Sequence, residues 1–334
     1  MKYFNKIKSL QSLFIFCFLI FGVAACSEKQ SESTSTVEEA ISTDKVDMAE
    51  CDRKCISSKV NNYVKGLVEH KVPADLLAPD IRVTENGVDV KPGEGVWKTI
   101  TDQGGYQQVF IDSSLNEAVF FGAFKEQEDS LLLAVRLKFA DGKVSEAEHL
   151  LSRPDTRNRL IYRHSLTEPN PVYEQAVENP LSREKLVRIG HAYFDGIANS
   201  TDEGVPMDPY CNRRENGVLL LKNKNPETEP CPIGFHRFNY ITDVRDRRVA
   251  VVDEERGLVL IWGYFDIPGD VDVAPGPWGP SDIDSPNGEP RVDTRKIPRS
   301  LYIAELFKVV DGGNIRDIEA IMFNLDLGAK SGWE

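Results

Sequence analysis

Several residues in the second half of the chain have side chains that can transfer a proton. His236 lies between aromatic residues in the segment GFHRF at 234–238, and an imidazole can act as a general acid or base near neutral pH. Glu215 and Asp208 supply carboxylates that can pair with it. We therefore predict His236 as a proton shuttle, with Glu215 or Asp208 as its carboxylate. The alternative is a structural histidine beside carboxylates that are solvated or paired with arginine.

The same half of the chain has residues that can hold a substrate oxygen. Tyr193 lies on the face of a predicted helix that the rest of the domain would enclose, where a phenol can donate a hydrogen bond. Arg213 and Arg214 alternate in direction along a predicted strand, so one of them faces inward and can bind a carboxylate. We place Arg214 in the site, and the alternative is a salt bridge to Glu215 or Asp208. The other predicted substrate-binding residues are His191, Trp262 and Tyr264.

The sequence has no motif of the common enzyme classes. It contains no Gly-x-Ser-x-Gly elbow, nucleotide-binding loop, dinucleotide fingerprint or His-Glu-x-x-His helix, which argues against serine hydrolases, nucleotide enzymes, Rossmann oxidoreductases and zinc proteases. Cys and His do not cluster at ligand spacing, so we predict no metal and no cofactor. The 53 Asp and Glu outweigh 40 Lys and Arg, and the net charge of -13 argues against nucleic acid as a partner.

An internal repeat organises the chain after residue 51. Similar residues recur in the same order in two copies, and the second copy carries extra residues before and after its aromatic strand. The aligned positions are Tyr63 with Tyr193, Glu-Asn-Gly-Val at 85–88 with 215–218, the aromatic segment 120–124 with 261–265, and Asp-Gly at 141–142 with 311–312.

Each copy has the pattern of one helix followed by strands. Apolar residues at three-to-four spacing predict helices over 53–70 and 183–200. The Asn-Gly and Asp-Gly pairs predict tight hairpin turns, and alternating apolar residues between them predict strands. The sequence therefore predicts an α+β protein with two tandem units, each combining a helix with a strongly bent antiparallel sheet.

This order of elements, with its Glu-Asn-Gly hairpin, resembles the SnoaL-like branch of the nuclear-transport-factor-2-like superfamily. The resemblance covers residues 51–153 and 183–330. Short motifs such as Cys-Asp-Arg at 51–53 and Gly-Glu-Gly-Val-Trp at 93–97 also look like secreted bacterial and fungal proteins of unassigned function. The resemblance implies that a curved antiparallel sheet wraps each long helix into a cone with a deep pocket. Members are lyases, isomerases and hydrolases, small-molecule carriers or protein-binding modules.

We place the predicted site in the second cone, because only that copy has the extra segments and the ionisable residues named above. Residues 266–300 are rich in Pro, Gly and Asp, which predicts a long loop. Loops of this length often act as lids, and Trp278 could close a pocket mouth. The segment 282–288 resembles a calcium loop superficially but lacks its third acidic position and its closing Glu.

The N-terminus predicts export from the cytoplasm. Lysines precede an apolar run from Leu13 to Val23, which is too short to span a bilayer. Val-Ala-Ala-Cys at 23–26 resembles the lipobox of bacterial lipoproteins, which implies lipidation of Cys26 and anchoring to a membrane. The alternative is a plain secretory signal cut after Ala25. We expect the protein in the cell envelope, at the outer membrane if the host has two membranes, because Ser27 follows the cysteine.

The predicted segments follow from these features. Residues 27–50 are rich in Ser, Thr and Glu with few large apolar residues, a composition that favours a disordered tether. The segments are a signal peptide at 1–25, a lipidated Cys and tether at 26–50, a first SnoaL-like domain at 51–153, a linker at 154–182, and a second SnoaL-like domain at 183–334 with the lid loop at 266–300.

Four cysteines remain in the exported chain, and an oxidising compartment favours their pairing. Three connectivities are possible, and proximity in the sequence favours Cys51 with Cys55 and Cys211 with Cys231. The alternative is a zinc site, for which the spacing is poor.

These features together predict an exported, membrane-anchored lipoprotein with a pocket in its second cone. We expect a cofactor-free lyase, isomerase or hydrolase that acts by acid/base chemistry on a small organic or sugar-like ligand. The alternative is a non-catalytic surface lipoprotein that binds a small molecule or docks on another protein.

Overall fold

The computed structural model describes four ranges of the chain, 51–127, 129–153, 168–271 and 294–333. The predicted signal peptide, Cys26 and the tether lie outside the described residues, as do Trp278 and the segment 282–288. In the four described ranges, no helix is long and apolar enough to cross a membrane. The two copies of the repeat belong to one compact unit.

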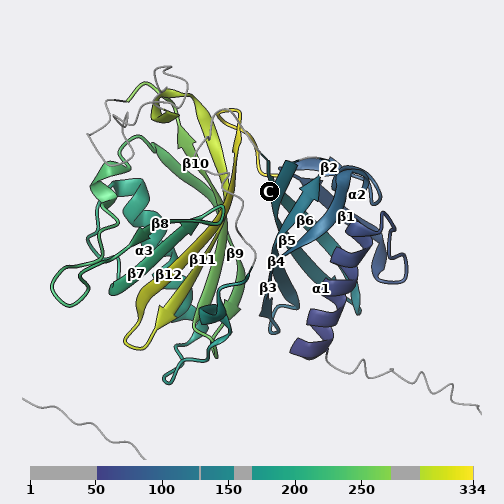
Figure 1. Cartoon of the computed structure of the whole chain (residues 1–334), viewed down its shortest axis with the longest axis horizontal. Helices are drawn as coiled ribbons and strands as arrows, with labels where there is room; N and C mark the ends of the chain where they lie inside the picture. The colour runs from purple at the N-terminus through teal and green to yellow at the C-terminus, as the bar shows by residue number, and fades with distance from the viewer. Residues whose placement is uncertain (1–50, 128, 154–167, 272–293, 334) are drawn as a thin grey trace, which may run out of the picture. The chain divides into compact units, whose positions relative to one another are not determined.

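The first copy packs one long helix against a six-stranded sheet (Figure 1). The strands lie in the order β2-β1-β6-β5-β4-β3. Its elements are α1 (Arg53–Val68), β1 (Leu77–Glu85), β2 (Val88–Val90), α2 (Val96–Thr99), β3 (Ile100–Asp112), β4 (Glu117–Glu126), β5 (Asp129–Ala140) and β6 (Lys143–Ser152).

The second copy repeats this arrangement with the strand order β8-β7-β12-β11-β10-β9. Three short 3₁₀-helices are added to it: η1 (Pro171–Glu174) before the long helix, η2 (Phe235–Arg237) and η3 (Thr294–Lys296). Its other elements are α3 (Arg183–Asn199), β7 (Met207–Glu215), β8 (Val218–Lys222), β9 (Asp243–Asp253), β10 (Leu258–Ile267), β11 (Arg299–Val310) and β12 (Asn314–Leu325). The predicted α+β class with two helix-and-sheet units is confirmed.

Each sheet has one parallel pair, β1 with β6 and β7 with β12. Each of the predicted antiparallel sheets therefore includes one parallel pair. After the first hairpin the chain crosses to the far edge of the sheet and returns strand by strand, so that the last strand reaches the first one in the parallel direction. The remaining neighbours are antiparallel, as the hairpin turns require.

The Asn-Gly turns that the two copies share have a structural role. Asn86 and Asn216 have positive φ angles of 46° and 42°, and the glycines that follow have φ of 83° and 81°, as a two-residue hairpin turn needs. The Asn86 side chain accepts from the Leu151 amide (2.8 Å) and donates to the Leu151 carbonyl (3.2 Å). Asn216 makes the same two bonds with Met322 (2.8 and 3.0 Å). Each asparagine thus ties its hairpin to the last strand of its sheet.

Both predicted disulfides are formed, Cys51 with Cys55 and Cys211 with Cys231. The first lies at the start of α1, where the Asp52 carboxylate caps the helix by accepting from the Cys55 amide (2.8 Å). The second ties β7 to the extra segment that follows β8.

Successive side chains along each strand point to opposite faces of the sheet, and both faces of each sheet are buried. One face packs against the long helix of its own copy, with α1 contributing Val60 and Tyr63 and α3 contributing Tyr193 and Phe194. The opposite faces of the two sheets share a third core that includes Phe121, Trp262 and Tyr302. Tyr173 of η1, which lies in the predicted linker, is buried in this shared core.

Candidate functional site

A group of polar side chains lies among the apolar residues that face α3. On β7, Arg213 and Glu215 lie two residues apart and therefore share a face. On β11, Glu305 lies between Ile303 and Phe307, which both belong to the core around α3. We call Tyr193, Arg213, Glu215, Tyr240 and Glu305 the Arg213 cluster.

Arg213 connects three other members of this cluster. Its Nε lies 2.7 Å from Oε1 of Glu215, and Nη2 lies 3.4 Å from Oε1 of Glu305. Nη1 donates to the phenol oxygen of Tyr193. The guanidinium also lies 5.8 Å from the ring centroid of Phe238. A single cation, 6% exposed, therefore faces two carboxylates and one phenol.

Glu305 is the chemically unusual member of the cluster. It is fully buried, and neither carboxylate oxygen accepts a hydrogen bond from the described part of the chain. Burial raises the pKa of Glu305 to about 7, with Glu215 adding to the rise and Arg213 opposing it. Near neutral pH this carboxyl is about half protonated, so it can both take and give a proton.

The two tyrosines of the cluster stay protonated at neutral pH. Burial raises the pKa of Tyr193 well above its ordinary value, and it raises the pKa of Tyr240 to about 12. Since Tyr193 accepts from Arg213, its own hydroxyl proton remains available to another acceptor. The cluster therefore combines a titrating carboxyl, a fixed cation and a phenol donor in a water-poor setting.

The first copy holds a different polar group around its equivalent tyrosine. The Tyr63 hydroxyl lies 2.9 Å from Nε2 of His149, and the rings of Tyr63, Trp97 and His149 lie within 5.9 Å of one another by centroid. Burial lowers the pKa of His149 to about 3, so its ring is neutral at physiological pH. Val135 occupies the position that Glu305 has in the second copy. The first copy therefore lacks a buried group that titrates near pH 7 at this position.

Comparisons with known proteins find similarity at the level of fold. A family model described as a domain of unknown function, DUF8021, matches residues 179–322. None of the curated proteins matches the sequence. The chain is also similar to solved structures of SnoaL-like and NTF2-like proteins.

Three solved structures illustrate the similarity. A protein described as a SnoaL-like polyketide cyclase from Jannaschia sp. CCS1 is 15% identical, with a TM-score of 0.28, and covers 43% of this chain and 90% of its own. A steroid delta-isomerase from Pseudomonas aeruginosa is 16% identical, with a TM-score of 0.23, over 30% and 80% of the two chains. A de novo designed NTF2-fold protein is 15% identical, with a TM-score of 0.25, over 32% and 90%. Similarities of this size say nothing about activity.

Two of the predicted site residues, Tyr193 and Glu215, lie in the Arg213 cluster. Arg214 lies outside this cluster, because it is the member of the arginine pair that faces away from α3. It lies opposite Glu319 in the strand register, where burial raises the pKa of Glu319 and the charge of Arg214 partly opposes that rise. Arg213 has the inward position instead.

The predicted histidines do not reach this cluster. His236 is exposed, because η2 turns the neighbouring Phe235 into the core around α3. The described contacts of His236 include no carboxylate, so its predicted role as a proton shuttle is not supported. His191 is half-buried on α3, where burial and Arg247 lower its pKa while Asp195 opposes the change.

Asp208 is already satisfied by neighbours outside the cluster. One carboxylate oxygen accepts from the Tyr210 amide (2.7 Å), and the other lies 3.0 Å from Nη2 of Arg316. Asp208 of β7 is therefore paired with Arg316 of β12, and its described contacts do not include His236.

Trp262 and Tyr264 lie on the face of β10 opposite to α3. Both belong to the core between the two sheets, where the Tyr264 ring stacks on Tyr302 at 4.6 Å. Even-numbered residues of β10 face the other sheet, whereas Ile261 and Phe265 face α3. The structure therefore places these two aromatic residues between the sheets and away from the core around α3.

Glu305 is not among the residues predicted from the sequence, although the pattern of β11 indicates it. Leu301, Ile303, Phe307 and Val309 form an apolar row at alternate positions of β11, and Glu305 is the one charged residue within this row. A single acidic residue in a buried apolar row lowers the stability of the fold unless its charge is paired, so such a residue is a candidate functional group. Among the residues the structure describes, no group of three or more His, Cys, Asp or Glu could hold a metal ion.

Proposed function

We propose that the second copy is a cofactor-free active site in which Glu305 transfers a proton. The single observation that carries this proposal is the buried Glu305 carboxyl, which receives no hydrogen bond in the described structure and lies beside a cation and a phenol. A carboxyl that only stabilised the fold would be ionised and fully hydrogen-bonded. Perturbed groups of this kind are typical of functional sites.

The roles of the neighbours follow from their chemistry. Ionised Glu305 accepts a proton from a carbon next to a carbonyl, or from an attacking hydroxyl. The Tyr193 hydroxyl donates to the substrate oxygen on which negative charge develops, and Arg213 stabilises that charge electrostatically. Protonated Glu305 then returns the proton, which completes an isomerisation, an elimination or a hydrolysis. The substrate is a small organic or sugar-like molecule with a carbonyl or ester group.

Deuterium exchange tests the proton transfer without knowledge of the final product. The full chain is incubated in deuterated water with a panel of cyclic ketones and lactones, and loss of the proton next to the carbonyl is followed by NMR. We expect the native protein to catalyse exchange, with a rate that rises with pH through about 7 because the ionised carboxylate is the base.

One glutamate variant in each copy locates the site. Glu305→Gln should lower the exchange rate at least a hundredfold, as expected for loss of a general base. Glu85→Gln in the first copy should leave the rate unchanged. Exchange that survives in Glu305→Gln would show that Glu305 is not the base. Exchange that is lost in Glu85→Gln would move the site to the first copy, and no exchange by the native protein would favour a non-catalytic binding protein.

We also propose that the protein works as a lipoprotein of the cell envelope, anchored through Cys26. The lipobox-like segment 23–26 and the Ser-rich residues that follow it support this proposal. Cys26→Ser should release the protein from membranes without lowering its thermal stability. Retention of the variant in the membrane fraction after a high-salt wash would contradict the anchor.

A further inference from the structure

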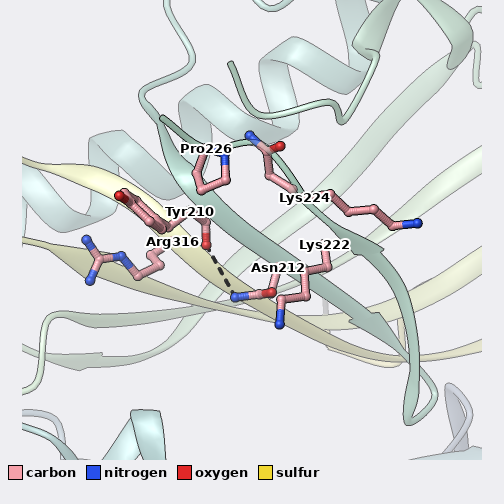
Figure 2. Close-up of a pocket in the computed structure, with 7 residues that line it drawn as sticks. Tyr210, Asn212, Lys222, Lys224, Pro226 and Arg316 are labelled. Atoms are coloured by element: carbon pink, nitrogen blue, oxygen red, sulfur yellow. Dashed lines mark hydrogen bonds between the residues drawn. The ribbon is translucent and has the colours of Figure 1, made fainter. Parts of the chain in front are cut away.

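The second copy has an open groove of about 830 Å³ beside the β7–β8 hairpin (Figure 2). Tyr210, Asn212, Lys222, Lys224 and Arg316 line it. Tyr210 and Asn212 alternate along β7 with Cys211 and Arg213, so they point to the opposite face of the strand from the Arg213 cluster. The groove is therefore separate from the proposed active site.

The wall of the groove is fixed before any ligand arrives. The Asn223 side chain is buried and donates to the carbonyls of Pro209 (2.8 Å), Glu229 (3.0 Å) and Pro230 (3.2 Å). The disulfide from Cys211 to Cys231 closes the same loop onto β7. A site held in this way loses little conformational entropy on binding.

The acidic side chains around the groove have partners, whereas its two lysines form no ion pair among the described residues. Asp208 is paired with Arg316 (3.0 Å), Asp317 accepts from the Asn212 amide (3.2 Å), and Glu227 accepts from the Tyr210 hydroxyl. Lys222 and Lys224 are exposed, and neither takes part in an ion pair among the described residues. Two ammonium groups therefore remain available at one place on a chain whose net charge is -13.

Tyr210 gives the groove an aromatic wall. Its side chain is 48% exposed, its hydroxyl is held by Glu227, and the Arg316 guanidinium lies 5.9 Å from the ring centroid. A fixed, exposed ring face packs against the C–H face of a sugar ring, and the neighbouring amide of Asn212 can bond to sugar hydroxyls.

The first copy does not have this groove. The extra segment after β8 that forms its wall is missing there, and Arg82 stands at the position of Asn212. The ring of Trp333, near the end of the chain, covers Arg82 at 4.5 Å from the guanidinium carbon to the ring centroid. The equivalent surface is therefore occupied by the protein itself in one copy and open in the other.

We propose that the groove binds an acidic saccharide, with a sugar ring on Tyr210 and its carboxylate between Lys222 and Lys224. The site is open and combines an aromatic ring with cationic and amide side chains, which suits a segment of a longer sugar chain better than a small buried substrate. Paired lysines attract the carboxylate, and the aromatic ring and amide recognise the uncharged part of the ring.

The test is isothermal titration calorimetry of the full chain with trigalacturonic acid, its methyl ester, inorganic phosphate and vesicles that contain phosphatidylglycerol. We expect trigalacturonic acid to bind, with an affinity that falls at least fivefold on going from low to high salt. Lys222→Glu with Lys224→Glu should weaken binding at least tenfold, and Tyr210→Ala at least fivefold. The matched charge reversal Lys91→Glu with Lys185→Glu, at two exposed lysines outside the groove, should leave binding unchanged.

Four results would overturn the proposal. If the methyl ester bound as tightly as trigalacturonic acid, the lysines would not recognise a carboxylate. Binding of phosphate or vesicles without trigalacturonic acid would make the groove a phosphate site. Equal loss of binding in the control variant would show a general charge effect. No binding of trigalacturonic acid by the native chain, with its circular dichroism spectrum intact, would exclude a saccharide site.

Discussion

The two long helices present equivalent tyrosines to different polar partners. Tyr63 meets the neutral His149, whereas Tyr193 meets the cation Arg213 and, through it, two carboxylates. The exchange of Val135 for Glu305 between the copies adds the carboxyl whose pKa burial raises to about 7. A few side-chain differences therefore distinguish the candidate site of the second copy from the equivalent core of the first copy.

The buried His149 should make the protein sensitive to acid. Its pKa is about 3 in the folded state and about 6.5 in the unfolded chain, so below pH 6.5 the unfolded state binds a proton that the folded state does not. Each pH unit from about 6 down to 4 should then cost up to about 1.4 kcal/mol of unfolding free energy. Urea unfolding of His149→Gln over this range should show a shallower loss of stability than the native protein.

Tyr63→Phe is the matched control for this prediction. It removes the hydrogen bond to His149 but keeps the ring buried, so the steep acid dependence should persist at a lower overall stability. If His149→Gln and the native protein lose stability in parallel, burial of this histidine is not the cause.

How much of the site the sequence predicts depends on strand register. Tyr193 and Glu215 are recognisable because both repeat in the first copy as Tyr63 and Glu85. Arg213 and Arg214 are adjacent, and a shift of one residue exchanges the face that each occupies, so the pattern alone leaves the choice open. Glu305 has no counterpart in the repeat, and its role is visible only once β11 is placed against α3.

At the scale of elements, the Asn-Gly hairpins hold the first strand of each sheet to the last. The Asn216 side chain makes both of its bonds to the buried main chain of Met322. Asn216→Ala would leave a buried amide and carbonyl without side-chain partners, so we expect a loss of about 1–3 kcal/mol in urea unfolding. Asn61→Ala, at an exposed position of α1, should cause no loss. If Asn216→Ala left the unfolding free energy unchanged, strand pairing alone would hold the hairpin.

The elements themselves were the most predictable part of the molecule. The predicted helices 53–70 and 183–200 agree with α1 and α3 to within two residues, because apolar spacing and the capping residues define them. The parallel pairing of β7 with β12 could not be predicted, since it depends on a crossover between distant segments. The apolar pattern also did not predict the short helix η2, so the exposed position of His236 could not be predicted either.

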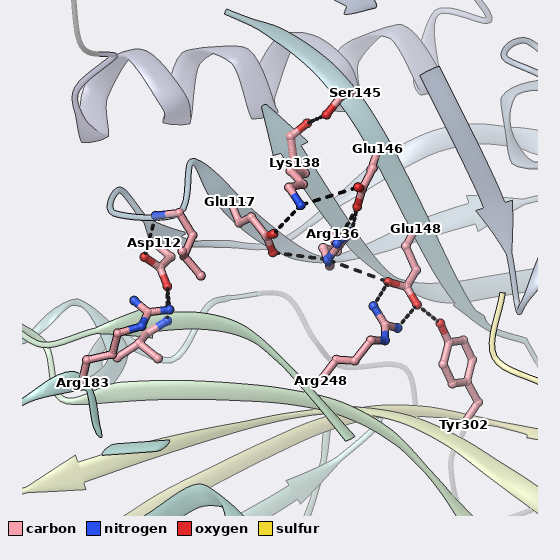
Figure 3. Close-up of polar contacts among 12 residues, drawn as sticks. Asp112, Glu117, Arg136, Lys138, Ser145, Glu146, Glu148, Arg183, Arg248 and Tyr302 are labelled. Carbon is pink, nitrogen blue, oxygen red and sulfur yellow. Dashed lines mark hydrogen bonds and ion pairs between the residues drawn. The ribbon is translucent and has the colours of Figure 1, made fainter. Parts of the chain in front are cut away.

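Across the whole molecule, ion pairs join the two copies of the repeat (Figure 3). Glu148 of β6 is fully buried and lies 2.5 Å from Nη2 of Arg248, and it accepts from the Tyr302 hydroxyl. Asp112 of β3 lies 2.7 Å from Nη2 of Arg183. Trp262 and Tyr264 lie in the core that the two sheets share.

Removing one partner of such a pair should be costly. Arg248→Met leaves the buried Glu148 carboxylate with only its weaker neighbours, Tyr302 and the more distant Arg136 (4.0 Å). We expect the unfolding free energy to fall by about 3–5 kcal/mol. The double variant Arg248→Met with Glu148→Gln should recover much of this loss, because no unpaired charge remains. Equal losses in the single and double variants would contradict a role for the charge pair.

The central claim is that Glu305 is a buried carboxyl that gains and loses a proton near neutral pH. Infrared difference spectroscopy of the native protein between pH 5 and 9 measures this directly, since a protonated carboxylic acid has a carbonyl stretch that the carboxylate lacks. We expect a carboxylic acid band that disappears with a midpoint near pH 7 and is absent from Glu305→Gln. A spectrum of the native protein without such a band, or a band of equal size in Glu305→Gln, would contradict it.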